Sequence, residues 1–226
     1  MLYYLLNLFY PEVCLGCSNV LITNEKSICT TCRHNLPLTK HIEQPNNEVF
    51  SRFYGRLPLE HASSMLYFTK KGLVQKIIHK LKYKNREEVG SVLGDWYGYD
   101  LQKIQSNYKF DVIIPVPLHK KRFSERGYNQ LTKFGEAISS NLNIPFEENL
   151  LKRDVYELTQ TKRNFFDRTK DKKTTFSINS DLNYNNTHFL LIDDVITSGA
   201  TLEACGKALL AIPGSKISIV TLACSI

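Results

Sequence analysis

The sequence predicts an α/β fold in which a parallel sheet carries helices on both faces, with a small four-cysteine zinc finger ahead of it. Three short apolar runs have the length of strands buried on both faces: FDVIIPVP (110–117), FLLIDDV (189–195) and KISIVTLAC (216–224). Apolar residues at helical spacing follow the first two runs, over 131–142 and 202–210. Alternation of strands and helices in this way is typical of parallel sheets.

Length and composition set the limits for this fold. The chain has 226 residues, of which 42% are hydrophobic, enough for one main domain and a short appendage. No window approaches the roughly 18 consecutive apolar residues of a membrane-spanning helix, and the first residues lack the basic start and cleavage site of a signal peptide. We therefore expect a cytoplasmic protein without a membrane span. Its net charge of +7 favours phosphates, nucleic acids or acidic surfaces as partners.

Four of the six cysteines gather early in the chain as two C-x-x-C pairs, and they are Cys14, Cys17, Cys29 and Cys32. Two close pairs of thiolates on two turns are the ligand set of a tetrahedral zinc site. The alternatives are disulfides, which conflict with a cytoplasmic chain, and core cysteines, which conflict with the polar residues around the cluster. Four sulfur ligands leave no position for water, so this zinc is predicted to be structural.

The segments around the cysteines complete the predicted order of elements. Apolar spacing predicts a short helix over 2–10, and Pro11 ends it. Residues 33–62 are polar and contain three prolines, which predicts an irregular linker. A strand at 63–68, a helix with an apolar stripe from Leu73 to Leu81, and a second helix near 87–105 follow. We therefore divide the chain into a zinc-finger region with its leading helix (1–40), a linker (41–62) and the α/β domain (63–226).

The helix that starts near Leu73 also carries a basic ridge, in which Lys76 and Lys80 lie a turn apart and Lys82, Tyr83, Lys84 and Arg86 follow at its end. Lys76, Lys80 and Lys84 are the candidate DNA-binding residues. Lysines interleaved with an aromatic ring suit single-stranded DNA, with phosphates on the lysines and a base on the ring. The alternative is an ordinary solvated helix face.

The run FLLIDDVITSGATL (189–202) places two carboxylates, Asp193 and Asp194, just beyond a predicted strand. Ligands of open α/β sheets bind at the carboxyl ends of strands. The loop that follows offers backbone N–H groups, hydroxyls and a glycine at the start of a helix, where the dipole favours an anion, and it comprises Thr197, Ser198, Gly199, Ala200 and Thr201. Carboxylates beside a phosphate must face hydroxyls or hydrated Mg²⁺, so a ribose 5-phosphate fits. The alternative is a plain strand with Asp194 or Ser198 capping the helix.

This stretch resembles the phosphoribosyl-pyrophosphate (PRPP) signature of the type I phosphoribosyltransferases. The resemblance implies a phosphoribosyltransferase-like domain over 63–226. It also implies that Asp193 and Asp194 hold the ribose hydroxyls and that the loop from Thr197 to Thr201 holds the 5′-phosphate. Ala200 departs from the pattern, since a second glycine is common there.

A second stretch, DVIIPVPLHKKRFSERGYNQ, also begins at a strand end and turns basic at once. Its "R…RGxNQ" part, Arg122 and 126–130, resembles the competence protein ComF family, which also opens with a short helix and a zinc finger. The resemblance implies that the loop Pro115, Val116, Pro117 and Leu118 receives pyrophosphate, with Arg122 and Arg126 stabilising its charge. The alternative is a solvated basic turn that opens a helix at Tyr128.

Residues 156–175 form a long charged excursion, which in a compact domain is usually functional. Arg163 and Arg168 are candidates for a lid that closes over the pyrophosphate. A disordered charged loop is the alternative.

Two functions are compatible with these motifs. The ComF resemblance implies a cytoplasmic factor that binds Mg-PRPP and handles incoming single-stranded DNA during natural transformation, together with DNA-uptake and DNA-processing proteins. The alternative is an active phosphoribosyltransferase, in which Asp193, Asp194, Arg122 and Arg126 are catalytic and the acceptor is an unidentified base or amine.

Overall fold

The computed structural model describes residues 9–83, 86–155, 174–179 and 183–226. Most of the helix predicted over 2–10, Lys84 of the basic ridge, and the lid candidates Arg163 and Arg168 lie outside these residues. Among the described residues, no helix combines the length and apolar character needed to cross a membrane.

The core is the predicted parallel sheet. Its four strands lie in the order β1-β6-β5-β2 and comprise β1 (His61–Phe68), β6 (Lys216–Ser225), β5 (His188–Ile196) and β2 (Val112–Pro115). All three pairings between neighbours are parallel. The three apolar runs form β2, β5 and β6, whose central residues are fully buried because helices cover the sheet.

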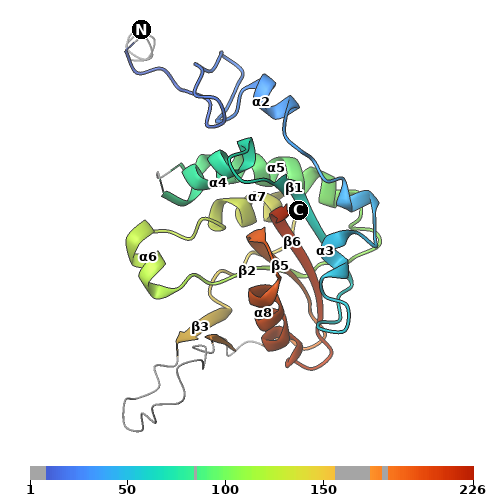
Figure 1. The fold of residues 1–226 in the computed structure, drawn as a ribbon. Coiled ribbons are helices and arrows are strands. Elements are labelled where there is room, and N and C mark those ends of the chain that lie inside the picture. The colour runs from blue at the N-terminus through green and yellow to red at the C-terminus, as the bar shows by residue number, and fades with distance from the viewer. Residues whose placement is uncertain (1–8, 84–85, 156–173, 180–182) are drawn as a thin grey trace, which may run out of the picture.

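Two helix layers cover the sheet, as Figure 1 shows. Connections between parallel strands are right-handed, so chain segments that cross the sheet in opposite directions lie on opposite faces. One layer holds α4 (Leu73–Tyr83), α5 (Glu88–Gln102) and α7 (Thr132–Leu142), and α8 (Ala200–Leu210) covers the other face. Consecutive side chains of β5 therefore point alternately toward α7 and toward α8.

Helices α5 and α7 pack closely because α5 presents glycine at every fourth position, namely Gly90, Gly94 and Gly98. A Cβ added at Gly94 would lie 2.6 Å from the carbonyl oxygen of Phe134 and 2.7 Å from Cβ of Ala137. These distances are shorter than van der Waals contact, so the close approach needs glycine. The interface fixes α7, whose preceding loop contributes to the site.

Both edges of the sheet are extended by short bridges rather than left open. Residues 37–39 lie against β1, where the N–H of Thr39 donates to Met65 (3.1 Å) and that of Tyr67 to Pro37 (2.8 Å). At the other edge Phe146 forms a parallel bridge with Ile113 of β2. Covered edges of this kind protect a sheet against pairing with other chains.

Several elements differ from the sequence prediction. The segment predicted as an irregular linker contains the 3-10 helix η1 (His41–Glu43) and α3 (Glu48–Ser51), and β1 begins within it at His61. Asn47 organises this segment because its side chain caps α3 and donates to the carbonyl of Ala62 (2.8 Å). The basic stretch after β2 forms α6 (Lys120–Arg126), and a hairpin of β3 (Leu151–Val155) and β4 (Thr174–Ile178) flanks the charged excursion.

The cysteine region contacts the helix layer through α4 and α5. It contains α2 (Thr30–His34). A Cβ added at Gly16 would lie 2.6 Å from the side chain of Leu73 in α4, so this turn sits directly on that helix. The guanidinium of Arg33 lies over the ring of Trp96 in α5, 4.3 Å from its centroid.

Candidate functional site

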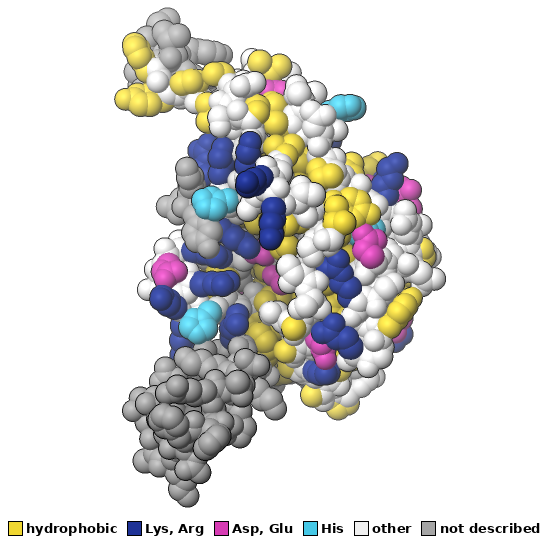
Figure 2. All heavy atoms as spheres, viewed as in Figure 1, with side chains coloured by type: hydrophobic (Ala, Val, Ile, Leu, Met, Phe, Trp, Pro, Cys, Tyr) yellow, Lys and Arg dark blue, Asp and Glu magenta, His cyan; other side chains and the backbone are white. Residues whose placement is uncertain are grey.

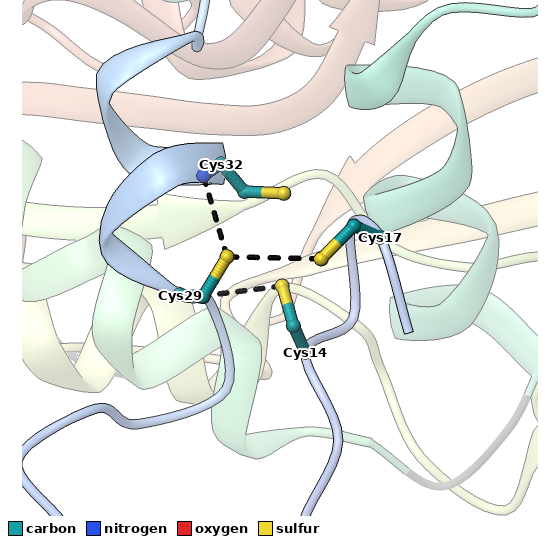
Figure 3. Close-up of side chains that lie close together, drawn as sticks. All are labelled: Cys14, Cys17, Cys29 and Cys32. Atoms are coloured by element: carbon teal, nitrogen blue, oxygen red, sulfur yellow. Dashed lines mark hydrogen bonds between the residues drawn. The ribbon is translucent and has the colours of Figure 1, made fainter. Parts of the chain in front are cut away.

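The four clustered cysteines point their sulfur atoms toward one another (Figure 3). The sulfur atoms of Cys14, Cys17, Cys29 and Cys32 all lie within 4.8 Å of one another, and those of Cys17 and Cys29 are 3.7 Å apart. A zinc ion with Zn–S bonds of about 2.3 Å needs sulfurs roughly 3.8 Å apart at the corners of its tetrahedron. The donor set and its spacing therefore fit structural zinc, as predicted.

Backbone N–H groups donate to a sulfur atom of this cluster and so favour its thiolate form. The N–H groups of Gly16 and Cys29 donate to Sγ of Cys14 at 3.3 and 3.2 Å. Burial raises the pKa of Cys14, but these backbone hydrogen bonds outweigh it and lower the pKa to about 6. Burial and the neighbouring thiols raise the pKa of Cys32. The thiols thus differ in acidity without a metal, and bound zinc would hold all four as thiolates.

The acid pair lies inside β5 rather than just beyond it, because the strand continues past Ile192, where its end was predicted, to Ile196. Strand β6 supports this extension by pairing Asp193 with Thr221 and Ile196 with Cys224. Strand β2 stops level with Ile192. Consequently Asp193 and Asp194 lie where β5 extends beyond the end of β2, which forms a step at the edge of the sheet. Because side chains alternate along a strand, the two carboxylates point to opposite faces.

Asp194 faces the α4–α7 side and is paired there through one of its oxygens. Nζ of Lys82 lies 2.8 Å from its Oδ2, and the side-chain amide of Gln130 donates to the same oxygen at 2.6 Å. Nη1 of Arg126 in turn donates to Oε1 of Gln130 at 2.5 Å. Arg126 and Asp194, both predicted as site residues, are therefore brought together through Gln130, which was not a predicted site residue. A carboxylate held in this way does not cap a helix, so the capping alternative fails for Asp194.

Asp193 faces the opposite side, toward α8. Burial first, and then the neighbouring carboxylate of Asp194, raise the pKa of Asp193 to about 8. The hydrogen bond from the N–H of Asp194 (2.8 Å), and then Lys82 and Arg153, act to lower this pKa. Arg153 of β3 has a buried Nε without a hydrogen-bond partner among the described residues, and its guanidinium lies 5.7 Å from the ring of Phe176. The two acids thus differ strongly in their environment.

The small loop after β5 encloses a hollow of about 50 Å³ lined by Asp193 and residues 195–202. Gly199 is the N-cap of α8 with φ of +77°, a left-handed conformation that favours glycine, and no side chain caps the helix. Ser198 Oγ is 3.4 Å from the N–H of Ala200, which is a long contact. The N–H groups of the first turn of α8, which have no acceptor within the helix, therefore lie beside the hollow. Ala200 is already helical, so the local geometry does not need a second glycine there.

Two arginines that sequence reasoning missed hold this loop from behind. The guanidinium of Arg52 donates to the carbonyls of Ile196 (3.3 Å), Thr197 (2.6 Å) and Ser225. Arg56 donates to the carbonyl of Ser198 at 3.0 Å and pairs with Glu203. Both donate to backbone oxygens, a role for which no sequence pattern exists. The arginine bracket (Arg52 and Arg56) thus binds carbonyls of the loop and leaves its N–H groups free of these two side chains.

The predicted pyrophosphate loop follows β2 directly. Pro115 and Val116 are buried, and the N–H of Val116 donates to Ile192 at 2.9 Å. Pro117 and Leu118 line a larger cleft that the hairpin strand β3 closes on its other side. Arg122 is exposed on α6, whereas Arg126, one turn later on the same helix, is half-buried and contacts Gln130. The basic stretch is therefore a helix of its own and not a simple turn before Tyr128.

The basic ridge is present only in part among the described residues. Lys76 is exposed and Lys80 is half-buried on α4, whereas Lys84 lies outside the described residues. Lys82, at the end of the ridge but not among its three candidate lysines, turns inward to Asp194. Figure 2 shows Lys and Arg side chains gathered on the flank that α4 and α6 share.

Comparisons with known proteins agree with this geometry. A family model described as a double zinc ribbon domain matches residues 5–43. Competence protein F of Haemophilus influenzae is 31% identical over 137 residues, covering 59% of this chain, and the match spans 60% of that protein's length. Competence protein ComFC of Bacillus subtilis is 26% identical, covering 88% of this chain and 78% of that protein. DNA utilization protein YhgH of Escherichia coli K12 is 24% identical, with 88% and 84% covered.

Solved structures give a weaker likeness. A purine phosphoribosyltransferase from Pyrococcus horikoshii aligns with a TM-score of 0.40 at 20% identity, covering 58% of this chain and 74% of that one. Adenine phosphoribosyltransferase from Saccharomyces cerevisiae gives 0.37 at 17% identity, with 61% and 69% covered. Scores this low carry no argument about the chemistry of the site.

The zinc site leads to the first testable prediction. We expect reduced, purified protein to contain one zinc per chain, and Cys14→Ser or Cys29→Ser to lower zinc content and melting temperature together, because such sites fold around their metal. Metal analysis and thermal unfolding of the same samples measure both. Cys205→Ala, which alters a buried thiol outside the cluster, serves as control and should keep its zinc. Parent protein without zinc would refute the assignment.

The environment of Asp193 leads to a second prediction. Its pKa in the folded chain, about 8, exceeds the ordinary value of 3.8, so its contribution to stability is full below about pH 4 and is lost as pH rises through 8. Asp193→Asn removes this loss. We expect the Tm of the variant relative to the parent to rise by about 3 °C or more between pH 5 and pH 8.5. Asp95→Asn, an exposed acid on α5, should show no such trend; a flat difference for Asp193→Asn would contradict the assigned environment.

Proposed function

Because this chain belongs to the ComF family and joins a phosphoribosyltransferase-like α/β domain to a zinc ribbon, we propose that it binds Mg-PRPP and handles single-stranded DNA in the cytoplasm during natural transformation. The observation that carries the PRPP part is the step at the end of β5. There two carboxylates precede a loop that lines a small hollow at the N-terminus of α8. The names of the relatives, competence protein and DNA utilization protein, support the DNA part.

In this proposal each part of PRPP has its own place. The 5′-phosphate binds the loop from Thr197 to Thr201, where N–H groups and the dipole of α8 favour an anion. The ribose hydroxyls and hydrated Mg²⁺ bind at Asp193 and Asp194. Lys82 already neutralises Asp194, so the ligand must replace or share that ion pair. The pyrophosphate lies along residues 115–118, with Arg126 near the acid pair and Arg122 farther out on α6.

The lysine-rich flank supports DNA binding. Its cations, on α4 and α6, favour a polyanion, and the chain carries a net charge of +7. DNA-uptake and DNA-processing proteins are the partners that this role would require.

A second candidate function is an active phosphoribosyltransferase. It is favoured by the cleft of about 860 Å³ beside the Pro117–Leu118 loop, which has room for an acceptor. Departing pyrophosphate would then need the charge of Arg126. Incubation with Mg-PRPP and a panel of nucleobases or amines tests this candidate, since release of pyrophosphate with one acceptor would establish catalysis and release with none would leave binding alone.

The PRPP site leads to a third prediction. We expect PRPP with Mg²⁺, at a hundredfold excess over its Kd, to raise Tm by about 5–10 °C, because a ligand that binds only the folded state stabilises it by mass action. The double variant Asp193→Ala/Asp194→Ala should lose this shift. Differential scanning fluorimetry with and without ligand measures it, so changes in basal Tm cancel.

Two controls sharpen this test. Asp95→Ala removes an exposed acid from α5 and should keep the full shift. Mg²⁺ should be omitted rather than chelated, because a chelator would also attack the zinc site. An undiminished shift in the double variant would show that the acid pair does not hold the ribose.

The ridge leads to a fourth prediction. Each lysine that neutralises a phosphate of single-stranded DNA contributes about 0.7 to the slope of log K against log salt. We expect Lys76→Ala/Lys80→Ala/Lys84→Ala to weaken binding of oligothymidylate and to reduce that slope by about 2, while the PRPP shift persists. Fluorescence anisotropy over a salt series measures it. Unchanged binding by the triple variant would make the ridge a solvated face.

A further inference from the structure

The cleft beside α6 differs from the small hollow after β5, because it is larger and has apolar side chains on two walls. One wall comes from the loop after β2 and from α6, with Pro117, Leu118 and Phe123, and the other comes from Leu151 and Lys152 of β3. Its volume of about 860 Å³ lies within the range of ligand sites in proteins. Apolar surface on both walls suits a flat, weakly polar group between them.

Phe123 is the feature of this cleft that packing does not explain. Its side chain is 52% exposed, and no residue of α6 is buried, so the helix stands away from the core. An aromatic ring on a solvated helix costs solubility and contributes nothing to the core. Its ring lines the cleft directly beside Lys120 and Ser124. The position is that of a platform for another flat ring.

Cations flank this platform on both walls. Lys120 on α6 and Lys152 on β3 are exposed and line opposite sides of the cleft, and Arg153 lies next to Lys152. The acid of the cleft, Glu148, already accepts the hydroxyl of Thr132 at 2.5 Å. The cleft is therefore positive, with an aromatic ring between its charges. Alternation of cations with an aromatic ring matches the alternation of phosphates with bases along an unpaired strand.

We propose that this cleft holds an unpaired nucleotide of single-stranded DNA, with its base stacked on Phe123 and its flanking phosphates at Lys120 and Lys152. This inference rests on the proposed DNA binding and assigns the strand a path through the cleft in addition to the ridge. A base in a duplex is already stacked on its neighbours, so only an unpaired base can enter. Helices α4 and α6 share one basic flank, which lets one strand contact both (Figure 2).

The test is a double-mutant cycle between the ring and the base. Binding of fluorescent oligothymidylate and of an abasic strand of equal length is compared for the full-length parent and for Phe123→Leu, which keeps an apolar side chain. We expect Phe123→Leu to weaken binding of oligothymidylate on the order of tenfold, the usual effect of one lost base stack, and to leave the abasic strand unaffected. Phe123→Trp should restore binding. Lys120→Gln/Lys152→Gln should reduce the salt slope by about 1.4 for both strands.

Matched variants show where a failure lies. Tyr99→Leu and Lys103→Gln remove an exposed ring from α5 and an exposed cation from its C-cap, and should leave DNA binding unchanged. Equal losses on thymidylate and abasic strands, or no loss with Phe123→Leu, would overturn the cleft while leaving DNA binding by the ridge intact. If the parent bound the mononucleotide dTMP as tightly as it binds oligothymidylate, the cleft would hold a single nucleotide and the proposed path of the strand would be wrong. A parent that binds no single strand at moderate salt would overturn both the cleft and the DNA part of the proposed function, while the PRPP shift remains a separate result.

Discussion

The carboxylate of Asp194 is nearly buried at the end of β5, and the arrangement of the site depends on how that charge is compensated. A buried carboxylate without a partner costs several kcal/mol, so the fold must supply cations or donors to it. It does so with Lys82 from the last turn of α4 and Gln130 from the loop before α7. Three segments far apart in the sequence thus meet at one carboxyl group. Any ligand of this site enters an electrostatic arrangement that is already balanced.

Asp193 and the loop after it are stabilised differently from Asp194. Within the described part of the chain, Asp193 accepts the N–H of Asp194 but has no side-chain ion pair, and its pKa is raised, whereas the loop after it is fixed through its backbone. The arginine bracket binds the carbonyls of Ile196, Thr197 and Ser198, and Gly199 turns the chain into α8. The two arginines on this face therefore orient main-chain dipoles and are not among the residues that line the hollow. The site thus combines paired side chains on one side of β5 with a hollow lined largely by backbone on the other.

The sequence predicted those parts of the fold that depend on local patterns. Apolar runs gave β2, β5 and β6, helical spacing gave α4, α5, α7 and α8, and cysteine spacing gave the zinc cluster. The end of β5 was placed too early because two acids look like the end of a buried strand, whereas pairing with β6 carries the strand on to Ile196. The hairpin was missed because LKRDV is too charged to look like a strand.

The residues that complete the site were harder to predict because their roles depend on tertiary contacts. Lys82 looks like one more lysine of the basic ridge, and only the packing of α4 turns it toward Asp194. Arg52 and Arg56 bind backbone carbonyls about 145 residues away, for which no motif exists. Phenylalanine is usually a core residue, so the sequence gives no sign that Phe123 is exposed. Its exposure follows from the position of α6, which has no buried residue.

The contact between Arg33 and Trp96 gives the molecule a built-in optical reporter. Trp96 is the only tryptophan of the chain, and the cation that covers its ring belongs to α2, the helix that begins right after Cys29. The emission of an indole depends on the charge and water next to its ring. Intrinsic fluorescence of the unlabelled protein therefore senses whether the ribbon is seated on α5, and a titration with zinc can be followed in the same cuvette as one with PRPP or DNA.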